Sequence, residues 1–153
     1  MELTDRFTVH ASSQDVWALL WDLPRVAMCL PGCESIEVVD DTNLKARFAQ
    51  KVGPFQVSMD LDLVVQELTE KERIIVAGGG KDKRGNTLKL NRLMMELAPS
   101  SNHETDGETE VSYTMDFNLY GRLATLGNAI VKRKAEEMRA QFTERITAEL
   151  EGR

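Results

Sequence analysis

The sequence lacks the features that mark several large classes of protein. No apolar run approaches the ~20 residues that a membrane-spanning helix needs, and the first residues, M-E-L-T-D-R-F, lack the basic and apolar regions of a secretory signal. The net charge of −6 disfavours a nucleic-acid partner, because phosphate binding requires a basic surface. We therefore expect a cytoplasmic protein, with membrane contact at most peripheral and at the inner face of the membrane.

Cysteine and histidine are scarce, with two of each in the chain. A structural zinc site needs four ligands, and neither His10 nor His103 is placed to form a ligand pair with Cys29 or Cys33. The two cysteines bracket Pro31-Gly32, a helix stop followed by a strand. We expect a structural thiol pair at a packing corner and no metal, with a redox or metal role as the alternative. No nucleophile accompanies either histidine, so no catalytic residue is predicted.

Alternating apolar and polar residues are abundant and indicate strands with one buried face. The cleanest run is 55–66, in which the odd-numbered residues are all apolar. A change of phase between Leu90 and Leu93 predicts a β-bulge near Asn91-Arg92. The predicted strands span residues 2–10, 34–39, 44–49, 55–66, 72–78, 87–97 and 111–119, and residues 99–109 are expected to form a polar loop.

Helical spacing occurs in two places. Two short helices follow the first strand: Ser12 or Ser13 can cap the first, and Pro24 opens the second. From Arg122 to Leu150 apolar residues recur at threes and fours, which predicts one long amphipathic helix of about 42 Å. Because the strand connections are short, the sheet should be antiparallel. The expected α+β fold is one domain, residues 1–153, in which about seven curved strands grip the long helix and enclose a cavity.

Several polar motifs have an ordinary structural interpretation. Gly78–Lys81 lacks the spacing of a phosphate-binding loop and is expected to be a bulged strand end. Lys132–Lys134, with Arg122 and Arg139, forms a basic segment, which we interpret as a solvated helix face, with a docking patch for a partner protein or lipid headgroups as the alternative. Three aspartates, Asp60, Asp62 and Asp116, have the outward parity of their strands and should face solvent.

The inward residues are almost wholly apolar and rich in methionine, a flexible side chain that suits a pocket for an apolar guest. Ordinary core filling is the alternative for these methionines. The residues predicted to line a ligand cavity are Met28, Phe48, Phe55, Val57, Met59, Leu61, Tyr113, Met115, Phe117, Leu123, Leu126, Ile130 and Met138.

Four motifs resemble one known family. They are V-W-A-L-L-W-D-L-P-R-V-A-M-C-L-P-G-C-E-S-I-E (16–37), K-V-G-P-F (51–55), G-R-L-A-T-L-G (121–127) and Q-F (141–142). Together with the element order, they resemble the carbon monoxide dehydrogenase CoxG-like family of the SRPBCC/START-like superfamily, which has the helix-grip fold. The resemblance implies a non-catalytic accessory role beside a carbon monoxide dehydrogenase or a related molybdenum hydroxylase. It also implies a link to the membrane through a carried quinone.

Three hypotheses follow for the function. The first is binding of a hydrophobic small molecule, a quinone or a lipid-like compound, with no required cofactor. The second is an enzyme of the cyclase or hydrolase kind known on this fold, which needs an inward polar group, with Arg92 and Tyr113 as candidates. The third is an assembly or recruitment factor that acts through its surface around a solid core.

Overall fold

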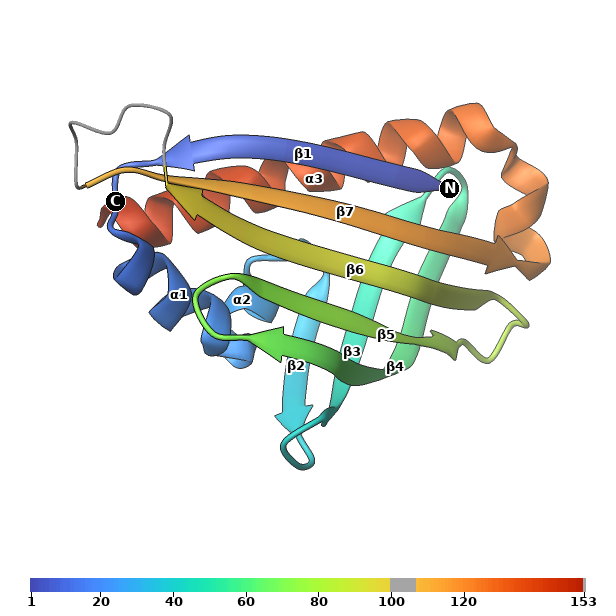
Figure 1. The fold of residues 1–153 in the computed structure, drawn as a ribbon. Helices are drawn as coiled ribbons and strands as arrows, with labels where there is room; N and C mark the ends of the chain where they lie inside the picture. The colour runs from blue at the N-terminus through green and yellow to red at the C-terminus, as the bar shows by residue number, and fades with distance from the viewer. Residues whose placement is uncertain (100–106, 153) are drawn as a thin grey trace.

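The computed structural model describes residues 1–99 and 107–152 and has the predicted order of strands and helices (Figure 1). A short 3-10 helix, η1, comes in addition before the last helix. The elements are β1 (Glu2–Val9), α1 (Ser13–Trp21), α2 (Leu23–Met28), β2 (Cys33–Val38), β3 (Asn43–Val52), β4 (Phe55–Thr69), β5 (Arg73–Lys81), β6 (Thr87–Pro99), β7 (Thr109–Tyr120), η1 (Gly121–Leu126) and α3 (Asn128–Glu151).

Within the described residues, seven strands form one antiparallel sheet in the order β1-β7-β6-β5-β4-β3-β2. The first strand therefore pairs with the last, with Leu3 opposite Met115. In Figure 1, β2, β3 and the first half of β4 run across the direction of β5, β6 and β7, and α3 passes behind β1. The sheet thus curves around the long helix, as the sequence predicted.

The bend of the sheet is built on the glycine run of β5. Gly78 lies opposite Leu63 of β4, and Gly80 lies opposite Leu61. A Cβ atom at Gly80 would overlap the carbonyl oxygen of Asp60, so β5 can approach β4 this closely only without a side chain there. The sequence predicted that this strand stops at residue 78, but the glycines continue the pairing to Lys81.

Two β-bulges accompany the bend. Between Val65 and Glu67, β4 has one residue more than β5, and between Leu90 and Leu93, β6 has one residue more than β5 and β7. The bulge in β6 was predicted, whereas the predicted strand 55–66 ended where the bulge in β4 begins. Bulges increase local twist and bend the strand that carries them, so both help to turn the sheet. The same curvature lets β4 extend to 15 residues, three more than predicted.

The single long helix that the sequence predicted is divided in the structure into two elements, η1 and α3. Gly127, with φ 84° and ψ 158°, interrupts the helical backbone between η1 and the 24-residue α3. This conformation is natural for glycine and strained for other residues. Leu123 and Leu126 are three residues apart, a spacing that fits a 3-10 turn as well as an α-turn, so the apolar period did not reveal the break.

A buried asparagine holds η1 against the sheet. Asn86, in the β5–β6 turn, donates from Nδ2 to Oδ2 of Asp82 (2.8 Å), and its Oδ1 accepts from the backbone N–H of Leu123 (3.0 Å). Buried polar groups need such partners. The turn and η1 are therefore fixed to each other, although 37 residues separate Asn86 from Leu123.

Candidate functional site

The predicted ligand-lining residues fall mainly on the concave face of the sheet and on η1. Phe117 is buried with Leu3 and Val131 in what we call the β1–β7 cluster. A second group, the β3–β4 cluster, consists of the buried residues Ala46, Val57, Met59, Leu61 and Leu123. The alternation in 55–66 therefore placed the inner face of β4 correctly.

Partly exposed apolar residues join these two clusters. Leu88, Leu119 and Leu126 pack against both. Phe48 and Phe55 are partly exposed beside the β3–β4 cluster, and Met115 is partly exposed beside the β1–β7 cluster. The apolar residues that pack against the two clusters are therefore not fully covered by the protein.

Other members of the predicted set lie elsewhere. Met28 is 52% exposed and borders a shallow depression of about 260 Å³ between α2 and α3, and Ile130 is 38% exposed at the start of α3. The prediction that both point inward is corrected, because α2 buries no side chain and the break at Gly127 resets the helical phase before Ile130. Met138 is half-buried. As ligand contacts, the whole set remains a prediction.

A polar network that the sequence analysis missed lies between β1, β7 and α3. Asp5 Oδ2 accepts hydrogen bonds from Arg139 (3.0 Å) and Thr143 (2.9 Å), and the hydroxyl of Tyr113 lies 3.5 Å from both Asp5 and Thr143. The Tyr113 ring meets Phe142 edge-on at 5.7 Å. Asp5 shares the inward parity of Leu3 and Phe7, and this was the signal available in the sequence.

The network also corrects the interpretation of Arg139 as part of a solvated helix face. Its side chain is only 27% exposed, and that of Asp5 only 19%. A second acid, Glu136, accepts from Nε of Arg139 at 2.8 Å. Partial burial strengthens such charge-assisted bonds, since less water competes for the same groups.

The network sets the protonation of its members. Burial by itself would raise the pKa of Asp5, but hydrogen bonds from the Arg6 backbone, Thr143 and Arg139 outweigh it and lower that pKa below the ordinary 3.8. Burial, together with the charge of Asp5, raises the pKa of the Tyr113 hydroxyl. At neutral pH we therefore expect an ionised Asp5 and a protonated Tyr113.

The Asp5→Asn variant should reduce the acid sensitivity of folding. Because the pKa of Asp5 is lower in the folded than in the unfolded state, its ionisation stabilises the fold above about pH 4, and this contribution is lost as the pH falls further. The difference in unfolding free energy between the wild type and Asp5→Asn should shrink between neutral pH and about pH 3. Urea denaturation at a series of pH values measures this, and a constant difference would contradict it.

The other candidate catalytic groups do not converge on the concave face. Arg92 is exposed, with its guanidinium 3.1 Å from the Met94 sulfur. His10 is exposed with Nδ1 3.3 Å from a carboxylate oxygen of Glu108, and His103 lies outside the described residues. Across residues 1–99 and 107–152, no group of three or more histidine, cysteine, aspartate or glutamate side chains could hold a metal ion.

The two cysteines are free thiols in different surroundings. Cys29 is buried with Leu19 and Ile146, whereas Cys33 is partly exposed and donates to the carbonyl of Ser35 at 3.6 Å. Burial raises the pKa of both thiols. A raised pKa disfavours the thiolate that nucleophilic and metal chemistry require.

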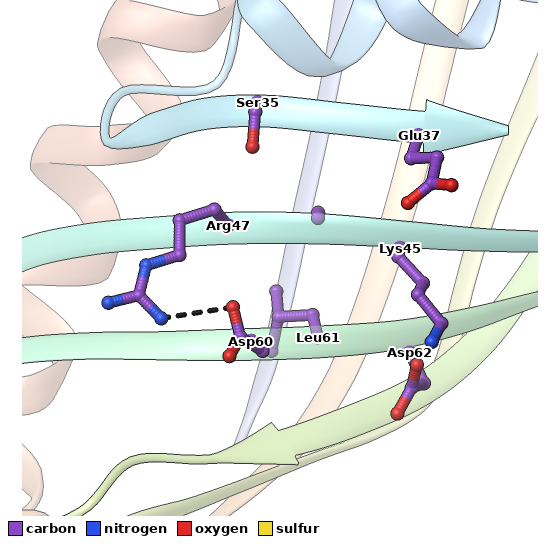
Figure 2. Close-up of a pocket in the computed structure, with 8 residues that line it drawn as sticks. Ser35, Glu37, Lys45, Arg47, Asp60, Leu61 and Asp62 are labelled. Carbon is purple, nitrogen blue, oxygen red and sulfur yellow. Dashed lines mark hydrogen bonds and ion pairs between the residues drawn. The ribbon is translucent and has the colours of Figure 1, made fainter.

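The outer face of β2, β3 and β4 carries a depression of about 320 Å³ (Figure 2). Arg47 reaches Asp60 at 2.9 Å and Ser58 at 2.7 Å, and Lys45 lies opposite Asp62 in the register of β3 and β4. Charges of both signs alternate across this face, which is typical of a solvated sheet surface. The prediction that Asp60 and Asp62 face solvent is confirmed.

Comparison with known proteins decides the family. A family model for CoxG, a subunit of carbon monoxide dehydrogenase, matches residues 6–151. The chain belongs to the CoxG family. No curated protein matches this CoxG-family chain.

Solved structures share the fold of this CoxG-family protein at low sequence identity. A conserved protein from Geobacillus kaustophilus aligns over 99% of this chain and 96% of its own, with a TM-score of 0.86 and 17% identity. A START superfamily protein from Mycobacterium smegmatis aligns over 99% and 97%, with a TM-score of 0.75 and 13% identity. The Zhui aromatase/cyclase from Streptomyces sp. R1128 aligns over 99% and 93%, with a TM-score of 0.70 and 13% identity. These likenesses show a START-like fold, as predicted.

The helices bear on the question of membrane contact. Among the described residues, none of the helices is both long and apolar enough to cross a bilayer.

Proposed function

We propose that this CoxG-family chain binds a hydrophobic small molecule, a quinone or a lipid-like compound, on the concave face of its sheet. It does so as a non-catalytic accessory to a carbon monoxide dehydrogenase or a related molybdenum hydroxylase. It needs no cofactor of its own, and it works in the cytoplasm with peripheral contact at the inner membrane face.

The single observation that supports the proposal is the partial exposure of the apolar residues that pack against both clusters. Leu88, Leu119 and Leu126 pack against both clusters, and the side chain of each is only partly buried. Covering apolar surface is favourable by roughly 25 cal/mol per Å². Met115 is partly exposed beside the β1–β7 cluster, and its flexible side chain can adapt to guests of different shape.

An enzymatic function is the alternative that the fold permits, since one similar structure is an aromatase/cyclase. It requires an inward polar group that is free to act on a substrate. Asp5, Arg139 and Tyr113 do point inward, but they bond to one another and to Thr143. Binding without catalysis therefore has the better support.

Leu126→Trp should weaken binding of a short-chain quinone probe about tenfold or more, because the larger ring occupies the surface that joins the clusters. Val64→Trp is the matched control, since Val64 is exposed on the outer face of β4. Isothermal titration calorimetry gives the affinities, and circular dichroism shows whether each variant is folded. Equal affinity in the two folded variants would place the ligand elsewhere.

Native mass spectrometry of protein purified gently from its own host distinguishes binding from pure assembly. A stoichiometric apolar molecule, identified after organic extraction, supports the proposal and names the ligand class. A mass that stays free of ligand after incubation with quinones and lipids would instead favour a factor that acts through its surface.

A further inference from the structure

Charge is distributed unevenly over the surface of this acidic protein. Three separate segments meet at one end of the molecule, where η1 and the start of α3 lie (Figure 1). Gly121 abuts the carbonyl of Gly85 in the β5–β6 turn, and Gly53 in the β3–β4 turn lies beside Leu126 and Ile130. We define the basic end by the exposed cations of these segments: Lys51, Lys83, Arg84, Arg122, Lys132 and Arg133.

The balance of charge at this end is the reverse of that elsewhere. Segments 51–55, 82–87 and 120–135 hold seven of the 19 lysines and arginines and only one of the 25 acids, Asp82. Asp82 is occupied by hydrogen bonds from Asn86 and from the backbone of Arg84. Lys134 pairs with Glu137 at 3.7 Å. Within the described parts of the chain, the six cations of the basic end form no ion pair.

Apolar side chains stand exposed among these cations. Tyr120 is 50% exposed at the end of β7, Ile130 is exposed at the start of α3, and Pro54 is exposed in the β3–β4 turn. Aromatic and aliphatic side chains interspersed with lysine and arginine suit the boundary between lipid headgroups and acyl chains. The guanidinium of Arg122 lies 4.8 Å from the centre of the Phe55 ring, which connects the basic end to the β3–β4 cluster.

We propose that the basic end docks on an anionic phospholipid surface. The acidic remainder of the protein is repelled by the same surface, so the charge distribution orients the molecule with η1 and α3 toward the lipid. This inference rests on the proposed function for the presence of an apolar ligand. Phe55, Leu123 and Leu126, which line the proposed ligand surface, lie at the basic end. An apolar ligand would then enter from the bilayer rather than through water.

The test is co-sedimentation of the full chain with vesicles of phosphatidylcholine alone or mixed with phosphatidylglycerol. We expect binding only to the mixed vesicles, and less of it as salt is added, because salt screens exposed charges. Lys132→Gln combined with Arg133→Gln should weaken it on the order of 30-fold, from two lost cations near an anionic surface. Lys45→Gln combined with Lys89→Gln removes the same charge from exposed positions in β3 and β6 and should change binding little.

The outcomes separate this proposal from the proposed function. Equal binding to both kinds of vesicle, no binding, or equal losses in the two double variants would overturn the docking surface. An acidic partner protein would then be the better occupant. The quinone probe is titrated without vesicles in parallel. Vesicle binding without probe binding would support the docking surface and contradict the proposed ligand binding. Probe binding without vesicle binding would support ligand binding and contradict the docking surface.

Discussion

Gly80→Ala is expected to lower the free energy of unfolding by about 3 kcal/mol or more. The added Cβ would overlap the carbonyl oxygen of Asp60 and would approach the side chain of Leu61 to 2.9 Å. The first of these contacts is with backbone, so it cannot be relieved by a change of rotamer. β4 and β5 would have to separate at the bend, which would break the pairing of Leu61 with Gly80. Urea denaturation followed by circular dichroism measures the loss.

Gly107→Ala is the matched control. A Cβ at Gly107 meets nothing within 4 Å, and its φ lies outside the left-handed region. We expect a change within about 0.5 kcal/mol there, the range for exposed positions without special backbone geometry. If Gly80→Ala cost no more than Gly107→Ala, the glycine run would be incidental and the curvature of the sheet would come from the bulges alone.

Arg139→Leu should lower the free energy of unfolding by about 2–3 kcal/mol, which is less than breaking a fully buried ion pair costs, because both side chains are partly exposed. The reason is that Asp5 stays charged on the inner side of β1 but loses the guanidinium at 3.0 Å. With burial less opposed, the pKa of Asp5 should rise, and NMR titration of its carboxyl group would detect this.

The double variant Asp5→Leu with Arg139→Leu tests whether the penalty comes from the unpaired charge. We expect it to recover most of the lost stability, because a pair of apolar side chains often replaces a buried ion pair without loss. The coupling energy follows from the two single variants and the double. Purely additive losses would mean that Asp5 and Arg139 stabilise the fold independently, through Thr143 and Glu136 respectively.

These two features have different relations to the candidate site. The glycine bend turns β3 and the first half of β4 across the rest of the sheet, which brings Val57 and Met59 to Leu123 of η1. The Asp5–Arg139 pair instead ties α3 to β1 beside the apolar lining. Damage to the bend should therefore affect both stability and ligand binding, whereas loss of the pair should affect mainly stability.

The alternation of apolar residues and the positions of turn and capping residues in the sequence were enough to predict most of the strands and helices. The inward set Val57, Met59 and Leu61 is buried as alternation required, and Ser12 caps α1 by accepting from the Asp15 backbone at 3.2 Å. The bulge beside Arg92 was visible because apolar residues change phase there. The bulge in β4 was not predicted, because the predicted strand ended at residue 66, where the pairing with β5 shifts.

The chain's own sequence thus determined the order of strands and helices, the inner face of β4 and the membership of the CoxG family, since these depend on local periodicity and on motifs. The tertiary structure alone decided which polar groups turn inward and which lysines and arginines share one surface. Asp5 could be placed beside Arg139 only when β1 was known to lie along α3. The segments that carry Lys51, Arg84 and Arg122 come together only in the folded chain. Such contacts depend on how the sheet bends, which no local pattern records.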